Sequence, residues 1–180
     1  MRWITSEGGP LLLLNEGNLD KWGGIDELIT GPAAHKSYSP FGRPTDYDRA
    51  CSVEGFIGSI AIGTEQGIVF GDEPMRTTSV PCQTECGVTI IRWVFGESEN
   101  EFLKCTVDIP ETLFRLDGAF AIRGPTLLLF DSALSGKNVK TSCSEFLTIE
   151  LESSVYDAKT AIYQPDERTS MVVHRLIRSS

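Results

Sequence analysis

Residues 88–95 read VTIIRWVF, and this stretch carries the strongest strand signal in the chain. β-Branched and aromatic residues occupy most of its positions, and such side chains pack well on a pleated, half-buried surface. Shorter apolar stretches recur on both sides of it, separated by turn residues. Repeated short strands with turn signals between them predict a sheet protein.

The neighbouring stretches extend this pattern over the whole chain. Apolar runs or alternation predict further strands at 11–14, 56–62, 67–71, 102–107, 119–123, 126–130, 146–151, 158–163 and 170–177. The acidic stretch ESENE at 97–101 is expected to be a hairpin loop, and short helices are expected only at 18–22, 26–29 and 110–116. The sequence therefore predicts a mainly β fold (β-rich α+β). We expect an antiparallel β-sandwich or open barrel of roughly 8–10 strands with one to three short helices.

The length of 180 residues suits one domain over residues 1–180. No repeat or linker divides the chain, but residues 30–46 carry three prolines without apolar periodicity. We expect them to form a long surface loop, and loops of this length are uncommon unless they are functional or mobile. The end of this loop is therefore a reasonable place to look for a site.

The chain is acidic, with a net charge of −9 and a pI of about 4.7. Negative charge disfavours direct binding of nucleic acid and favours a basic partner, although it also serves solubility alone. The four leucines at 11–14 are too few for a signal peptide, and no apolar run is long enough to span a membrane. We expect a cytoplasmic protein without a membrane partner, whose five irregularly spaced cysteines remain reduced.

The stretch PTDYDRAC at 44–51 contains the densest polar chemistry next to that loop. Asp46 and Asp48 could form a catalytic carboxylate pair, and Cys51 could be a nucleophile with His35 or His174 as its base. No nucleophile motif accompanies them, and a buried, unreactive Cys51 is the stronger expectation. We therefore predict no enzyme.

No cofactor or metal is expected either. Cys82 and Cys86 have a C-x3-C spacing but lack a second pair of ligands for zinc. Arg49 is expected to be structural, because its guanidinium can pair with Asp46, with Asp48 or with another acid. Trp3 and Trp93 are also expected to have structural roles.

Several segments, read in order, resemble one family. They are WITSEGGPLLLL at 3–14, Trp22-Gly23, TDYDRAC at 45–51, FIGSIAIG at 56–63, VFGDEP at 69–74, IRWVF at 91–95 and VHRLIR at 173–178. This series is similar to the Imm21 family of bacterial immunity proteins, which accompany secreted polymorphic toxins. The resemblance covers nearly the whole chain.

The resemblance implies a cytoplasmic protein that binds and neutralises a cognate toxin, expected as a 1:1 complex. The toxin is expected to be basic, as a nuclease or another nucleic-acid-targeting toxin would be, with its active site or substrate groove occluded. No catalytic residues are implied. Acidic side chains and one tyrosine are the candidates for toxin contact: Asp46, Tyr47, Asp48, Asp72, Glu73, Glu97, Glu99 and Glu101. The alternatives are a small cytoplasmic enzyme using Asp46/Asp48 or Cys51, and a scaffold protein unrelated to toxins.

Overall fold

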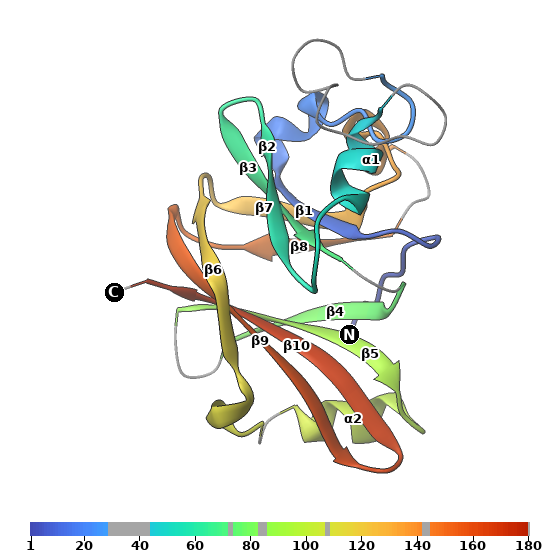
Figure 1. Cartoon of the computed structure of the whole chain (residues 1–180), viewed down its shortest axis with the longest axis vertical. Coiled ribbons are helices and arrows are strands. Elements are labelled where there is room, and N and C mark those ends of the chain that lie inside the picture. Colours follow the sequence, from blue (N-terminus) through green and yellow to red (C-terminus); the bar gives the residue numbers. More distant parts are fainter. Residues whose placement is uncertain (29–43, 72–73, 83–85, 107–108, 142–144, 180) are drawn as a thin grey trace.

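The stretch VTIIRWVF lies in β5 (Gly87–Phe95), which pairs with β4 (Arg76–Pro81) on one side and with β10 (Thr169–Arg178) on the other. The computed structural model describes residues 1–28, 44–71, 74–82, 86–106, 109–141 and 145–179. In this part of the chain two antiparallel five-stranded sheets stack on each other (Figure 1). The β-rich sandwich with few short helices predicted from the sequence is confirmed.

Each sheet combines segments that are far apart in the sequence. The order in the first sheet is β2 (Gly58–Ile62), β3 (Glu65–Phe70), β1 (Leu11–Asn15), β7 (Thr126–Asp131) and β8 (Phe146–Glu150). The order in the second sheet is β4, β5, β10, β9 (Ser154–Asp166) and β6 (Arg115–Ile122). Every neighbouring pair is antiparallel.

β1 shows why four consecutive leucines form a strand in this protein. Successive side chains of a strand point to opposite faces of the sheet. Leu11 and Leu13 enter the core between the two sheets, whereas Leu12 and Leu14 enter a second core on the outer face of the first sheet. All four are at most 1% exposed. A continuous apolar run is therefore the pattern of a strand that is covered on both faces.

Short helices cover both outer faces, so the protein has four layers (Figure 1). η1 (Glu16–Lys21), α1 (Asp46–Cys51) and α3 (Gly136–Val139) pack on the first sheet, and α2 (Glu99–Cys105) packs on the second. A further short turn of helix, η3 (Glu111–Leu113), precedes β6. Among the described residues, no helix is long and apolar enough to cross a membrane.

Two sequence predictions of local structure are wrong around the second sheet. Residues 97–101 and 102–107 were expected to form a loop and a strand, but Glu99–Cys105 is the helix α2. Phe102 and Cys105 are three residues apart and both join the apolar cluster under α2, and so short an apolar run does not distinguish a helix from a strand. β4 was not predicted, because its buried residues include Thr77 and Thr78 instead of large apolar side chains.

The predicted helices and the long loop also differ in extent. The helix expected at 110–116 is only η3, because β6 begins at Arg115. Residues 26–28 form no helix, and residue 29 lies outside the described residues. Residues 30–43 of the expected loop lie outside them too, while Thr45 caps α1 and Asp46 begins it.

Candidate functional site

PTDYDRAC contains the helix α1, which begins at Asp46 and ends at Cys51. Thr45 is its N-cap: the Thr45 hydroxyl accepts a hydrogen bond from the Asp48 amide at 3.2 Å, and the Asp48 carboxylate accepts one from the Thr45 amide at 2.7 Å. This reciprocal capping box satisfies amides for which a helix start has no internal partner. The T-x-x-D spacing of residues 45–48 is thus a helix-start signal that the sequence already contained.

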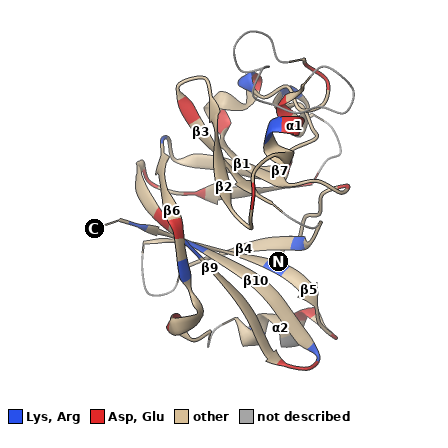
Figure 2. Ribbon diagram, in the orientation of Figure 1, with Lys and Arg blue, Asp and Glu red and all other residues tan. Residues whose placement is uncertain are grey.

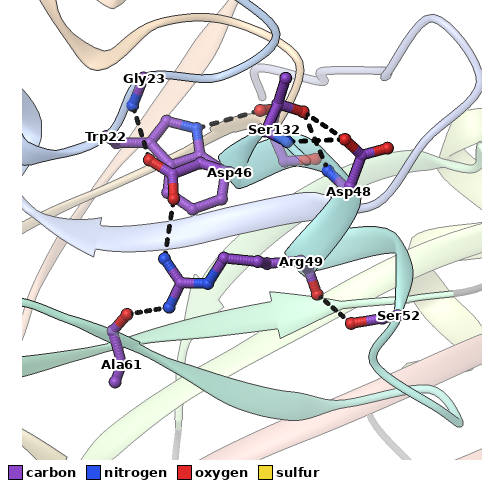
Figure 3. Close-up of polar contacts among 9 residues, drawn as sticks. Trp22, Gly23, Asp46, Asp48, Arg49, Ser52, Ala61 and Ser132 are labelled. Atoms are coloured by element: carbon purple, nitrogen blue, oxygen red, sulfur yellow. Dashed lines mark hydrogen bonds and ion pairs between the residues drawn. The ribbon is translucent and has the colours of Figure 1, made fainter. Parts of the chain in front are cut away.

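Asp46 connects α1 to two other parts of the protein (Figure 3). Its Oδ2 accepts a hydrogen bond from the Gly23 amide at 2.9 Å, and its Oδ1 forms an ion pair with Arg49 Nη1 at 2.7 Å. Arg49 also donates through Nη2 to the carbonyl of Ala61 in β2. The side chains of Arg49 and Asp46 are 21% and 14% exposed, so solvent screens this pair less than an exposed one.

The chain beneath α1 is itself anchored. Trp22 is 1% exposed, and its Nε1 donates a hydrogen bond to the carbonyl of Ser132 at 3.0 Å (Figure 3). The amide of Tyr47 donates to the carbonyl of Gly24 at 3.2 Å. Gly24 has a φ of 59°, which favours glycine. The polar groups of α1 therefore join the helix to the 22–24 segment and to β2.

Tyr47 and Cys51 lie one helical turn apart in α1. Burial, followed by the hydrogen bond with Cys51, raises the pKa of Tyr47 to about 12. Partial burial also raises the pKa of the Cys51 thiol, although Cys51 as a residue is exposed and not buried as expected. Ala50 is the helix residue that turns into the core, which leaves Cys51 near the surface. A nucleophilic cysteine requires a lowered pKa, so this environment does not activate the thiol.

Neither histidine supplies a base for Cys51 in the described structure. His35 lies outside the described residues. His174 is fully buried between the sheets, where its Nδ1 lies 2.8 Å from Thr160 Oγ1 and its ring lies edge-on to Phe70. Burial, followed by the charge of Arg92, lowers the pKa of His174 to about 3. The imidazole is therefore neutral near pH 7 and is engaged with Thr160.

The other acidic candidates for toxin contact are separate from α1. Glu99 lies in α2, where its carboxylate is 4.0 Å from Arg76, and Glu97 lies before α2 at 3.5 Å from Arg168. Both glutamate side chains are exposed, and Figure 2 shows charged positions distributed over both sheets and α1. Asp72, Glu73 and the side chain of Glu101 lie outside the described residues.

Trp3 and Trp93 lie in one aromatic group on the outer face of the second sheet. Trp93 stacks on Phe102 at 4.4 Å between ring centroids, and Trp3 meets both rings edge-on. The guanidinium of Arg76 lies over both tryptophans, at 5.2 Å from the Trp3 ring and 5.1 Å from the Trp93 ring. These contacts attach α2 and the N-terminal segment to β5.

A pocket of about 370 Å³ lies at the β6–β9 corner of the second sheet. We call it the Phe56 trough, and its lining residues are Phe56, Leu113, Arg115, Asp117, Thr160 and Ile162. No motif in the sequence indicated this pocket. One usable signal was Gly118 within the strand pattern RLDGAFAI, because an isolated glycine in a strand suggests a bulge.

The described ranges contain no group of three His, Cys, Asp or Glu side chains that could hold a metal ion. Cys51, Cys82, Cys86 and Cys105 are free thiols, and Cys143 lies outside the described residues.

Two stacked antiparallel sheets with short helices on their outer faces define a β-sandwich protein. The family model Imm21, immunity protein 21, matches residues 2–169, from the N-terminal segment through β9 to the start of β10. The chain therefore belongs to the Imm21 family, whose members are immunity proteins of toxin systems. No curated protein and no solved structure matches the chain.

Proposed function

We propose that this protein binds a cognate secreted toxin in the cytoplasm and neutralises it by occluding the active site or substrate groove. The family match over residues 2–169 carries this proposal. The raised pKa of the Cys51 thiol and the internal hydrogen bonds of Asp46 and Asp48 are consistent with binding instead of catalysis. The toxin partner is a single domain, bound 1:1.

The expected chemistry of the toxin follows from the charge of the immunity protein. A net charge of −9 attracts a basic surface and repels nucleic acid. A nuclease, or another enzyme that acts on nucleic acid, presents a basic substrate groove that an acidic inhibitor can cover. We therefore propose a basic, nucleic-acid-targeting toxin as the partner.

Co-expression with the toxin encoded next to this protein tests the function. Cells that produce the toxin with this protein should survive, cells with the toxin alone should not, and the purified pair should elute as a 1:1 complex in light-scattering chromatography. Survival of cells that produce the toxin and carry an empty control plasmid would show that the toxin is harmless. Failure of this protein both to bind the toxin and to protect the cells would refute the proposal.

The basic character of the toxin has its own test. Reversal of Glu97 and Glu99 to lysine should slow association, and the effect should shrink as salt is raised, because exposed charges are screened beyond about 8–10 Å. Reversal of Glu16 and Glu27, two other exposed glutamates with lysine partners, is the control for net charge alone. An association rate that is indifferent to salt would exclude a steered, basic partner.

A further inference from the structure

Apolar side chains that line the Phe56 trough are exposed to solvent. Ile162 of β9 is 59% exposed, and Leu113 of η3 is 40% exposed. Phe56 belongs to the segment between α1 and β2, which reaches down to the second sheet (Figure 1). It lines the pocket together with residues of β6 and β9. Exposed apolar surface beside a formed pocket is typical of a protein interaction site.

A β-bulge in β6 contributes charge to the rim of this trough. Leu116 pairs with Lys159 and Gly118 pairs with Ala158, so Asp117 is an extra residue without a cross-strand partner. Bulges change the direction of a side chain and are common next to functional sites. Here Asp117 and Arg115 both line the pocket, and β6 carries an acidic and a basic position (Figure 2).

The two faces of these strands use their charges differently. On the outer face, Lys159 and Arg175 both pair with Glu111, at 3.5 and 2.5 Å. Among the described residues, Arg115 and Asp117 form no ion pair. Their charges therefore remain available to a partner beside the exposed Ile162.

The floor of the trough is rigid. Thr160 is 7% exposed and its hydroxyl is bonded to the fully buried His174, so neither side chain is free to change rotamer without loss of this contact. Thr160 is paired on both sides, with His174 of β10 and with Arg115 of β6, and Ile162 is paired with Val172 of β10. A preformed pocket loses less conformational entropy when a partner binds.

We propose that the Phe56 trough is the surface that docks the toxin, an inference that rests on the proposed function. The occupant is one aliphatic or aromatic side chain that protrudes from the toxin and packs on Phe56, Leu113 and Ile162. A basic group of the toxin next to this side chain pairs with Asp117, and an acidic group pairs with Arg115. Anchor side chains in pockets, flanked by charge pairs, dominate the affinity of many interfaces.

Ile162→Asp tests the trough, and Leu116→Asp is its matched control. Leu116 is 66% exposed and lies in the adjacent strand, but its cross-strand partner Lys159 reaches Glu111 on the opposite face. We expect Ile162→Asp to weaken the toxin complex about 100-fold in calorimetry and to abolish protection, with an unchanged thermal unfolding midpoint. Leu116→Asp should change the dissociation constant by no more than about threefold.

A second substitution keeps the test decisive if Ile162→Asp does not fold. Asp117→Lys changes the charge at the rim and leaves Phe56, Leu113 and Ile162 in place, and it should weaken the complex about tenfold in low salt. If wild type binds the toxin and both trough variants bind equally well, the docking surface lies elsewhere and the proposed function stands. If wild type itself does not bind, the proposed function has failed independently. A wild-type homodimer that Ile162→Asp dissociates would assign the trough to self-association and overturn the proposal.

Discussion

α1 and the Phe56 trough both gather charged side chains, but they use them in opposite ways. In α1, Asp46 and Asp48 accept hydrogen bonds from backbone amides, and Arg49 is paired within the chain. In the trough, Arg115 and Asp117 have no ion-pair partner among the described residues and lie beside an exposed isoleucine. The first arrangement stabilises the fold, and the second leaves charge and apolar surface available to a partner.

This difference shows that density of polar residues in a sequence does not identify a binding surface. PTDYDRAC is the most polar stretch of its region, yet its carboxylates are directed to the protein's own amides. The trough is assembled from three separate stretches of the chain, around residue 56, at 113–117 and at 160–162. If the comparison is correct, substitutions in α1 should change stability, and substitutions in the trough should change affinity.

Within α1, the largest effect on stability is expected for Asp46→Ala. It leaves the Gly23 amide and Nη1 of Arg49 without their acceptor, which should cost about 2–3 kcal/mol in the free energy of unfolding. Urea denaturation measures this cost. Glu27→Ala is the control, because Glu27 pairs with Lys137 at the same 2.7 Å but with both side chains more than half exposed, and a much smaller loss of stability is expected. A loss of similar size in both variants would contradict the structural role of the α1 pair.

The free energy of unfolding is expected to depend on pH through His174, which is bonded to Thr160 at the floor of the Phe56 trough. The folded-state pKa of His174 is about 3, below the usual value of 6.5, so between these values the unfolded chain binds a proton that the folded protein does not. This contribution to stability is complete above pH 6.5 and is lost as the pH falls, by about 2 kcal/mol at pH 5. Urea denaturation at pH 8 and pH 5 should show a smaller pH dependence for His174→Asn than for wild type. Equal pH dependence would show that His174 is accessible to protons in the folded state.

A smaller loss of stability is expected when the capping box of α1 is disrupted. Thr45→Ala removes the hydroxyl that accepts from the Asp48 amide and should destabilise the protein by about 1 kcal/mol. Thr45→Ser keeps the hydroxyl and should restore most of this loss. Toxin affinity, measured well below the unfolding temperature, should be unchanged in both variants. A fall in affinity at constant stability would instead place α1 in the toxin interface.

The smallest effect on stability is expected in the trough itself. Ile162→Ser removes a side chain that is 59% exposed, and the free energy of unfolding should change by no more than about 0.5 kcal/mol. Val173→Ser, in the adjacent strand but fully buried, should be far more destabilising. A loss above 1 kcal/mol for Ile162→Ser would mean that Ile162 belongs to the core.

Local patterns predicted much of the fold. The apolar runs at 11–14 and 126–130 became β1 and β7, and VTIIRWVF became β5, because buried strands require such side chains wherever they pair. The same patterns failed at α2, where Phe102 would satisfy either a strand or a helix, and at β4, where small polar residues are buried by their neighbours. Burial of that kind depends on segments that are distant in the sequence.

The sequence by itself determined the β-rich class, the acidic character and the membership of the Imm21 family, because composition, periodicity and ordered motifs are properties of the chain. It also contained the capping signal of α1 in Thr45 and Asp48. Only the tertiary structure decided that Asp46 accepts a hydrogen bond from Gly23, that His174 is buried against Thr160, and that Phe56 and Ile162 line one pocket. The physical reason is that hydrogen-bond satisfaction and exposure are set by what packs against a side chain, and in a sandwich of long-range strand pairs those neighbours come from elsewhere in the chain.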